Sequence, residues 1–242
     1  MSVIYANKLS KTYTQFFKPP VKALHDVSFS VNEGEVVGLI GPNGAGKSTL
    51  LRLLLGFLPA DSGEVKLFNE HPESLRSRSR IGYQADSQYR AKNVSVKSFL
   101  HLHADLLGTE HVREHILHLL RTFELDNAYD RSLSSLSKGM RQKLELVFAF
   151  LGMPKLVFLD EPTAALDPPS VFVLRDFLAE QKKTGLTVLF SSHHLTEVES
   201  ICDRIIFIND GTVVEDSPMK EIGQGHLEEL FRKNLGMKGK GE

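Results

Sequence analysis

The chain has 242 residues, of which 41% are hydrophobic and 24% charged, a composition typical of a globular protein with a sizeable core. Its 29 Lys and Arg residues nearly balance its 30 Asp and Glu residues, so the net charge of -1 gives no indication of nucleic-acid or polybasic membrane binding. No apolar run of about 18 residues and no signal-peptide segment is present, so we expect no membrane-spanning helix and a cytoplasmic protein. The single cysteine, Cys202, is expected to be a small buried hydrophobic residue.

The first part of the chain predicts short strands. Residues 2–9 are rich in apolar side chains, and apolar residues alternate over residues 27–31. Between them, residues 15–20 (QFFKPP) predict a loop, because paired prolines are excluded from a central strand. Residues 35–40 form a short apolar run of the buried-strand type, and residues 47–56 predict a helix closed by a glycine. A strand, a glycine-rich loop and a helix in this order open an α/β nucleotide-binding unit.

The rest of the chain alternates between strand and helix patterns. Helical spacing covers residues 95–124, interrupted by Gly108, and returns at residues 144–150 and 170–183. Further strands are expected at residues 63–68, 80–84, 156–159, 187–190 and 205–208. We therefore predict a single α/β domain over residues 1–242. A mainly helical lobe near residues 85–152 would split its core, and a short tail near residues 225–242 would follow it.

A phosphate-binding pattern, G-x-x-x-x-G-K-[ST], occurs in residues 41–49 (GPNGAGKST). Glycines let such a loop curl so that backbone N–H groups point at phosphate oxygens, and the following helix directs its dipole at the same anion. Lys47 would neutralise the outer phosphates, and Ser48 would be a ligand of Mg²⁺. The alternative, a plain glycine-rich turn, is disfavoured by the strand before it and the helix after it. The predicted nucleotide-binding residues are Gly41, Pro42, Asn43, Gly44, Ala45, Gly46, Lys47, Ser48 and Thr49.

Two acidic residues, Asp160 and Glu161, end the apolar run of residues 156–162 (LVFLDEP). The carboxyl ends of strands are where open α/β sheets bind ligands. Asp160 would bind Mg²⁺ directly or through water, and Glu161 would orient and deprotonate the attacking water. The alternative is a solvent-exposed turn, because Asp-Glu-Pro is also a loop sequence. The phosphate-binding loop in the same chain favours a catalytic pair.

The sequence LSKGM at residues 136–140 opens a predicted helix over residues 141–150 and resembles the signature motif of ABC ATPases, usually written LSGGQ. Further motifs follow in the order of that family: Gln84 resembles its Q-loop glutamine, residues 165–167 its D-loop, and His193 its switch histidine. Tyr13 resembles the aromatic residue that stacks on adenine, with an ordinary edge-strand tyrosine as the alternative. On these motifs, which cover nearly the whole chain, the protein is identified as a member of the ABC ATPases.

The resemblance implies a P-loop NTPase core of the ABC-ATPase type, with an N-terminal antiparallel β subdomain and an inserted helical subdomain. It also implies a head-to-tail dimer, homodimeric or heterodimeric, that closes on two Mg-ATP and reopens after hydrolysis. Ser137 and Gly139 would contact the nucleotide of the partner, and the start of a helix favours such an anion. Ser137 would also be an ordinary helix N-cap. The catalytic residues implied are Glu161, His193 and Gln84, and the ligands of Mg²⁺ are Ser48, Gln84 and Asp160.

The motifs depart from the family pattern in the signature and the D-loop. Lys138 replaces the usual first glycine of the signature, and Met140 replaces its final glutamine. A lysine beside a triphosphate is electrostatically favourable, so we expect function to survive. Ala164 and Ala165 stand where serine and glycine are common in the D-loop, and this would alter communication between the two sites of the dimer.

Several histidines invite a catalytic or metal-binding interpretation. His193, rather than its neighbour His194, matches the spacing of the switch histidine, so His194 is expected to begin the next helix. His111, His115 and His118 share one helical face, and two histidines at i and i+4 can bind zinc. The pattern H-E-x-x-H is missing from this segment, so we favour a polar helix face.

The resemblance implies an ATPase that powers a transporter from the cytoplasmic face of the membrane, through a separate transmembrane permease subunit. Residues 92–108 resemble the lobe of exporter-type subunits. The alternative is an ABC-type ATPase acting on nucleic acid or ribosomes, which usually has two ATPase domains or a long coiled-coil insert. This chain has one phosphate-binding loop, no heptad run and balanced charge, so no nucleic-acid partner is expected. A non-catalytic nucleotide switch is disfavoured because Glu161 and His193 are both present.

Overall fold

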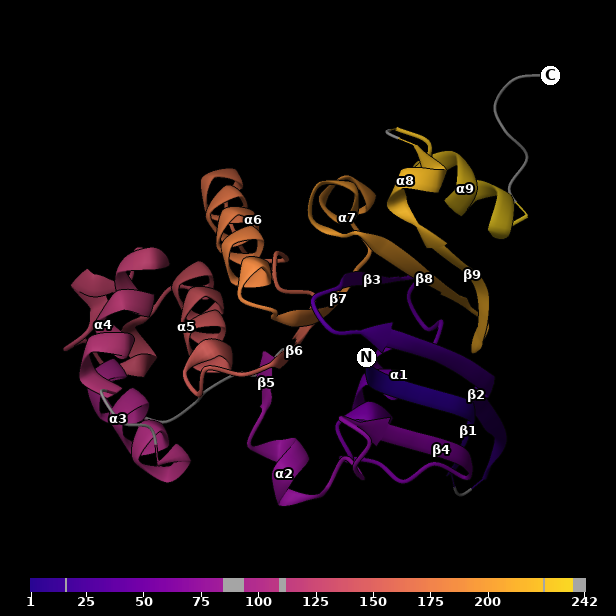
Figure 1. The fold of residues 1–242 in the computed structure, drawn as a ribbon, viewed down its shortest axis with the longest axis horizontal. Coiled ribbons are helices and arrows are strands. Elements are labelled where there is room, and N and C mark those ends of the chain that lie inside the picture. The colour runs from indigo at the N-terminus through magenta and orange to yellow at the C-terminus, as the bar shows by residue number, and fades with distance from the viewer. Residues whose placement is uncertain (16, 85–93, 109–111, 224, 237–242) are drawn as a thin grey trace. The chain divides into compact units, whose positions relative to one another are not determined.

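The computed structural model describes residues 1–15, 17–84, 94–108, 112–223 and 225–236 (Figure 1). The chain forms two compact units. The first unit comprises residues 1–78 and 187–242, and the second unit comprises residues 79–186. The predicted start of the helical lobe, at residue 85, lies outside the described residues, as does the end of the predicted tail. Among the described residues, no helix combines the length and the apolar character that crossing a bilayer requires.

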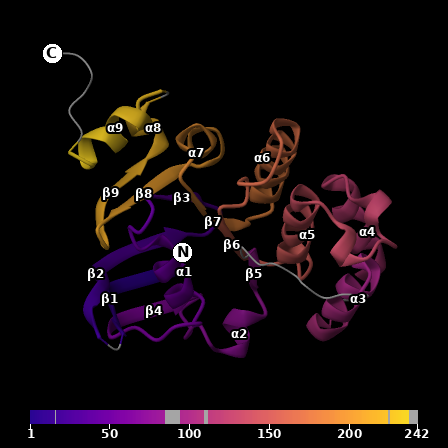
Figure 2. The ribbon, with the colours of Figure 1, turned by 180° about the vertical axis from the view of Figure 1, so that it is seen from behind.

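An antiparallel sheet of three strands, visible in Figures 1 and 2, begins the first unit. It contains β1 (Ser2–Gln15), β2 (Lys18–Asn32) and β4 (Ser62–Leu67), in the order β2-β1-β4. The loop predicted over residues 15–20 is wrong, because β2 already starts at Lys18 and contains both prolines. Since β2 is an edge strand, it tolerates residues that lack a backbone N–H.

A second sheet of the first unit has the strand order β7-β3-β8-β9. Its strands are β3 (Val36–Ile40), β7 (Thr187–Ser192), β8 (Arg204–Asn209) and β9 (Thr212–Pro218). Strand β3 runs parallel to both β7 and β8, and all residues of β3 and β7 are buried, as their apolar sequences predict. Strand β9 pairs antiparallel with β8 and was not predicted, because its sequence TVVEDSP is largely polar.

The helices of the first unit are α1 (Lys47–Leu54), α2 (Leu75–Arg78), α7 (Leu195–Ile201), α8 (Met219–Ile222) and α9 (Leu227–Asn234). Helix α7 packs against β3 at Gly38, where a Cβ atom would lie 2.8 Å from Val198 and 3.1 Å from the sulfur of Cys202. Cys202 is thus the small buried residue that the sequence predicts, and burial raises the pKa of its thiol.

The second unit contains the parallel strand pair β5 (Ile81–Gln84) and β6 (Leu156–Asp160). Its α-helices are α3 (Val96–Leu107), α4 (Val112–Thr122), α5 (Lys138–Phe150) and α6 (Pro168–Lys183), with short 3-10 helices at Asp126–Ala128 and Leu133–Ser135. Gly108 ends α3 in a left-handed conformation (φ 63), which explains the predicted interruption. Helix α5 begins at Lys138, within the signature motif that is predicted to open a helix over residues 141–150.

Aromatic side chains join the helices of the second unit. The ring of Phe177 on α6 packs edge-on against those of Phe123 and Phe150, with centroid distances of 5.1 and 4.8 Å. All three side chains are buried, and such edge-to-face contacts add about 0.5–1.5 kcal/mol per pair beyond the area they bury. The end of α5 is thereby fixed against α6, so α5 is a firmly supported element.

Candidate nucleotide-binding and catalytic site

The phosphate-binding loop joins β3 to α1 in the first unit. A Cβ atom at Gly41 would lie 2.2 Å from the carbonyl oxygen of Ile208, so a side chain cannot be placed there. Gly44 has a φ of 83, a left-handed conformation that favours glycine, and a Cβ atom there would meet nothing within 4 Å. Two glycines therefore shape the loop: Gly41 lets it lie directly against β8, and the exposed Gly44 provides a left-handed turn.

Lys47 closes this loop from the start of α1. Its side-chain nitrogen donates hydrogen bonds to the carbonyl oxygens of Gly41 (2.6 Å) and Pro42 (3.2 Å), and the residue is 8% exposed. The N-cap of α1 is Gly46, which has no side chain to accept hydrogen bonds from the N–H groups of the first helical turn. A helix start of this kind, with a lysine beside it, fits a phosphate anion.

Tyr13 lies close to this loop. Its hydroxyl, on β1, is 3.4 Å from the hydroxyl of Thr49 in the first turn of α1. Tyr13 is partly exposed and pairs with Val21 across the β1–β2 hairpin. Ser48, beside Thr49, is exposed. The first unit therefore gathers Tyr13 and the predicted phosphate-binding residues in one place.

In the second unit, the acidic pair occupies the end of β6. Asp160 is the last residue of the strand and Glu161 follows it, and both are half-buried. Glu161 has a φ of 50, a left-handed conformation that is uncommon for a residue with a side chain. Such conformations occur preferentially at functional sites, where surrounding contacts maintain them.

Gln84 ends β5, which pairs with β6 so that Gln84 lies beside Leu159. Its amide nitrogen donates a hydrogen bond of 3.4 Å to a carboxylate oxygen of Glu145 on α5. Gln84 is 1% exposed and Glu145 is 4% exposed. The predicted Q-loop glutamine therefore contacts the helix that carries the signature motif.

The signature motif forms the start of α5. The hydroxyl of Ser137 accepts a hydrogen bond of 3.2 Å from the backbone N–H of Met140, so Ser137 is the predicted N-cap. A Cβ atom at Gly139 would lie 3.1 Å from the carbonyl oxygen of Ala165, which brings the signature against the D-loop. Lys138 is exposed. In the D-loop, a carboxylate oxygen of Asp167 accepts a hydrogen bond from the backbone N–H of Ser170 (3.2 Å) and caps α6.

His193 follows β7 in the first unit and is exposed, and its ring lies 4.0 Å, between centroids, from that of His194. His194 is the N-cap of α7, close to its predicted place at the start of a helix. In the second unit, His115 Nε2 lies 3.2 Å from the carbonyl oxygen of Phe150, within hydrogen-bond distance. His111 lies outside the described residues, among which no three His, Cys, Asp or Glu residues converge on a metal site.

Comparison of the chain with known proteins shows the family to which it belongs. Residues 24–164 match the model of the ABC transporter family. The chain is 35% identical to the lantibiotic transport ATP-binding protein SrtF of Streptococcus pyogenes, covering 88% of this chain and 90% of SrtF. It is 31% identical to the lipopolysaccharide export system ATP-binding protein LptB of Escherichia coli K12, covering 96% of this chain and 97% of LptB.

The chain belongs to the ABC transporter ATP-binding family. A dimeric structure of the ABC transporter cassette MJ0796 superposes with a TM-score of 0.82 at 25% identity, covering 89% of this chain and 98% of MJ0796. The predicted fold class, an α/β ABC ATPase with an antiparallel β subdomain, is confirmed. The predicted activity is confirmed as well, because this family consists of ATPases that serve transporters.

Two residues of the ABC ATPase that contact predicted site residues were not themselves predicted from the sequence. Glu145 contacts Gln84, and the amide of Gln142 contacts the backbone of Glu161. A signal for Glu145 exists in the sequence, because an acid stands between Leu144 and Leu146 in a helix that is otherwise apolar at this point. No comparable signal marks Gln142, which lies among charged and polar residues.

Proposed function

We propose that the chain hydrolyses ATP with Glu161 as the general base and with its nucleotide bound to the loop of residues 41–49. The observation that carries this proposal is the geometry of Lys47, held over the loop by the carbonyl oxygens of Gly41 and Pro42 at the start of α1. A lysine in this place, with the N–H groups of a helix start, complements a triphosphate. Tyr13, whose hydroxyl lies near Thr49, would stack on the adenine.

The remaining roles are those that the resemblance to ABC ATPases implies, and the chemistry of each side chain is compatible with them. Glu161 would accept a proton from the attacking water, and His193 would contact the γ-phosphate as it leaves. Ser48, Gln84 and Asp160 offer hydroxyl, amide and carboxylate oxygens, which is the donor set that Mg²⁺ prefers. When bound, Mg²⁺ would neutralise charge that develops on the outer phosphates.

Two copies of the ABC ATPase, or this chain and a second ATPase subunit, would form a head-to-tail dimer around two ATP molecules. Ser137 and Gly139 support this arrangement, because they start a helix of 13 residues whose positive end is exposed at Lys138. The ligand of that helix start would be the γ-phosphate of the partner's nucleotide. The dimer would close when ATP binds and reopen after hydrolysis, and residues 1–242 would act as one ABC ATPase domain.

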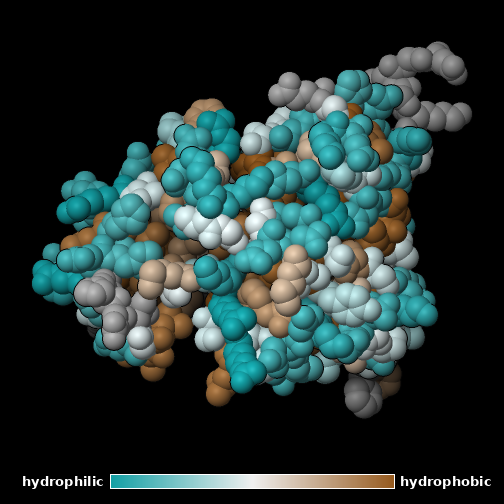
Figure 3. Space-filling model, viewed as in Figure 1, coloured by the Kyte–Doolittle hydropathy of each residue, from teal (hydrophilic) through white to brown (hydrophobic). Residues whose placement is uncertain are grey.

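We assign the transporter partner to a separate permease subunit, which would hold the chain on the cytoplasmic face of the membrane. Helix α3 offers a surface for it: Leu102, Leu106 and Leu107 are 59%, 76% and 51% exposed. Figure 3 shows hydrophobic surface in the region of this helix. Exposed apolar patches of this kind mark protein interfaces. We favour export over import for two reasons. The relative LptB belongs to an export system, and residues 92–108 resemble the lobe of exporter-type subunits.

The experiment is a tagged Glu161→Gln pull-down from detergent-solubilised cells with ATP present, analysed by mass spectrometry. We expect a polytopic membrane protein at comparable abundance. The matched control is Glu161→Gln combined with Lys47→Ala, which should recover less of any partner that requires ATP. Recovery of ribosomal proteins or DNA without a membrane protein would replace the transporter assignment by the alternative ATPase class.

A further inference from the structure

Helix α5 does more than present the signature motif at its start. It carries two polar side chains one turn apart, Gln142 and Glu145, on the part of the helix that faces β5 and the residues that follow β6. One of them contacts the segment that contains Glu161, and the other contacts Gln84. The helix that begins with the signature therefore touches both predicted catalytic residues of the second unit, Glu161 at its backbone and Gln84 at its side chain.

The contact of Gln142 is made to backbone carbonyls. Its amide nitrogen donates hydrogen bonds to the carbonyl oxygen of Pro162 at 2.9 Å and to that of Glu161 at 3.3 Å. Glu161 has the left-handed φ of 50, so its backbone needs support from neighbouring contacts. Because Gln142 binds the carbonyls of Glu161 and of the residue after it, it fixes the direction in which the Glu161 side chain leaves the backbone.

The contact of Glu145 is made to a side chain. One of its carboxylate oxygens accepts the hydrogen bond of 3.4 Å from the Gln84 amide. Glu145 is 4% exposed and stands between the buried residues Leu144 and Leu146. A carboxylate is costly to bury, and such groups are found where they bind a polar partner. The glutamine at the end of β5 is such a partner of Glu145.

We propose that Gln142 and Glu145 are positioning residues, through which α5 aligns the base Glu161 and the glutamine Gln84 for hydrolysis. The inference rests on the proposed roles of these two catalytic residues. Since both contacts start from one rigid helix, a shift of α5 at its signature end moves both residues together. Gln142 and Glu145 act through other residues and not on ATP itself, so their loss should lower turnover and leave nucleotide affinity unchanged.

Gln142→Met tests the first contact, because methionine has a similar length but no amide to donate. We expect kcat for ATP to fall roughly tenfold or more, since a catalytic group displaced by about 1 Å can cost up to a hundredfold. The KM for ATP should stay within about twofold, because the variant removes no interaction with bound substrate. In the Glu161→Gln background, Gln142→Met should lower turnover no further, because residues that act as a unit are not additive.

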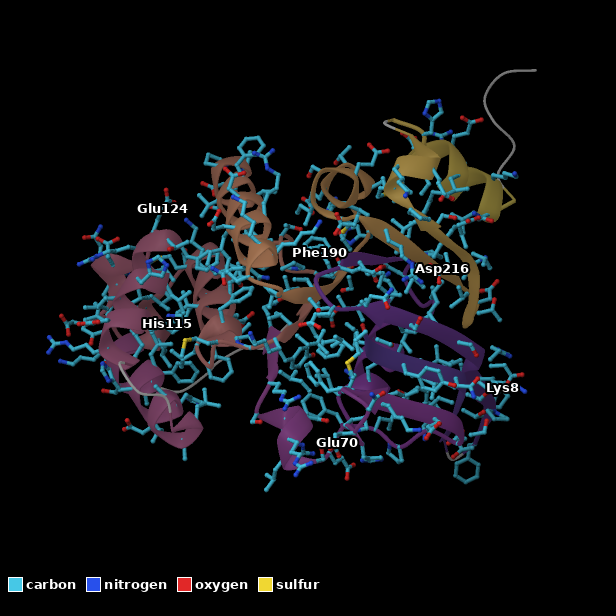
Figure 4. The ribbon with its side chains drawn as sticks, viewed as in Figure 1. Lys8, Glu70, His115, Glu124, Phe190 and Asp216 are labelled. Carbon is cyan, nitrogen blue, oxygen red and sulfur yellow. The ribbon has the colours of Figure 1, made fainter. Side chains whose placement is uncertain are left out.

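A conservative pair tests the second contact. Glu145→Gln keeps an oxygen that can accept from Gln84, so its kcat should stay within about threefold of wild type, whereas Glu145→Leu should lose about tenfold. Glu124→Gln is the matched control (Figure 4). It removes the exposed ion pair of 2.8 Å with Lys143, which lies on α5 between the two positioning residues, and should leave kcat unchanged.

Each outcome separates the inference from the proposed function. If Glu161→Gln is inactive while Gln142→Met and Glu145→Leu both keep wild-type kcat, the positioning role is wrong and the base assignment stands. If the variants lose ATP affinity together with turnover, or if Gln142→Met still lowers turnover in the Glu161→Gln background, the two residues support the fold and the inference is overturned. If Glu161→Gln is fully active, the proposed function itself fails.

Discussion

The side-chain nitrogen of Lys47 lies 2.6 Å from the carbonyl oxygen of Gly41, to which it donates a hydrogen bond. The lysine begins α1 and Gly41 directly follows β3, so this contact spans the phosphate-binding loop from one end to the other. It keeps the positive charge at the loop, where the curled backbone and the start of α1 also favour an anion.

We predict that Lys47→Ala weakens ATP binding by roughly tenfold or more, because it removes the charge that complements the outer phosphates. Isothermal titration with ATP measures the effect. Lys8→Ala is the control, since Lys8 is an exposed lysine of β1 whose backbone lies beside Gly63 of β4, outside the phosphate-binding loop (Figure 4). Equal ATP affinity in Lys47→Ala and wild type would contradict the assignment of the loop.

The exposed Lys138 at the start of α5 should assist pairing of two subunits. We predict that Lys138→Glu, in the Glu161→Gln background with ATP, weakens dimerisation a few-fold, because it replaces a charge that attracts the partner's triphosphate by one that repels it, and exposed charge pairs are worth about 0.2–1 kcal/mol. Sedimentation at several protein concentrations gives the dissociation constant, and added salt should reduce the difference. Lys155→Glu is the control, because it reverses the charge of another exposed lysine of the second unit, and this variant should dimerise normally. Unchanged pairing in Lys138→Glu would place the side chain away from the nucleotide.

The leucines of α3 should bind the permease. We predict that Leu106→Asp, which places a charge on the most exposed of them, reduces recovery of the membrane partner about tenfold or more, because a charge buried at an interface without a partner is costly. ATP turnover of the isolated chain should be unaffected. Phe17→Asp changes an equally apolar and fully exposed residue between β1 and β2, so it is the control. Loss of the partner in Phe17→Asp alone would move the docking surface to that hairpin.

Arg204 should stabilise the first unit through its contacts with Asp216 and Ser30 (Figure 4 labels Asp216). It donates two hydrogen bonds to the carboxylate, at 2.6 and 2.7 Å, and one of 2.9 Å to the backbone carbonyl of Ser30. Hydrogen bonding to Asp216 is the main reason why the pKa of Arg204 is raised. Because the site is partly exposed, we predict that Arg204→Met lowers the free energy of unfolding by about 1–3 kcal/mol.

Urea denaturation measures this loss. Arg232→Met is the control, because its ion pair with Glu228 lies on the surface of α9, and surface pairs contribute about 0–1 kcal/mol. A loss in Arg204→Met no larger than that of the control would mean that the Arg204 contacts contribute little to stability.

Buried strands could be predicted from the sequence, whereas the polar edge strand β9 could not. Strands β3, β6, β7 and β8 are short apolar runs, and burial on both faces imposes that composition. Strand β9 is polar because it is an edge strand, so its pairing with β8 depends on the neighbour rather than on its own residues. The prolines at the start of β2 led to a wrong loop prediction for a related reason, because an edge strand tolerates prolines.

The chemical motifs of the site were predictable, and the contacts that align them were not. Lys47 belongs to a loop whose spacing is dictated by the phosphate, so a short local pattern reveals it. Gln142 acts through hydrogen bonds to Glu161 and Pro162, about twenty residues away in sequence. Such contacts arise only when α5 packs beside the residues that follow β6, and nothing in the local sequence specifies which carbonyls a half-buried glutamine will meet.

The most direct test of the proposed mechanism is steady-state ATP hydrolysis by Glu161→Gln, measured together with its ATP dissociation constant. We predict that turnover falls on the order of a hundredfold or more, because the glutamine cannot accept the proton of the attacking water. ATP affinity should remain that of wild type, since the phosphate-binding loop is unchanged. Wild-type turnover in Glu161→Gln would contradict the mechanism, because the acid at the end of β6 would then not be the base.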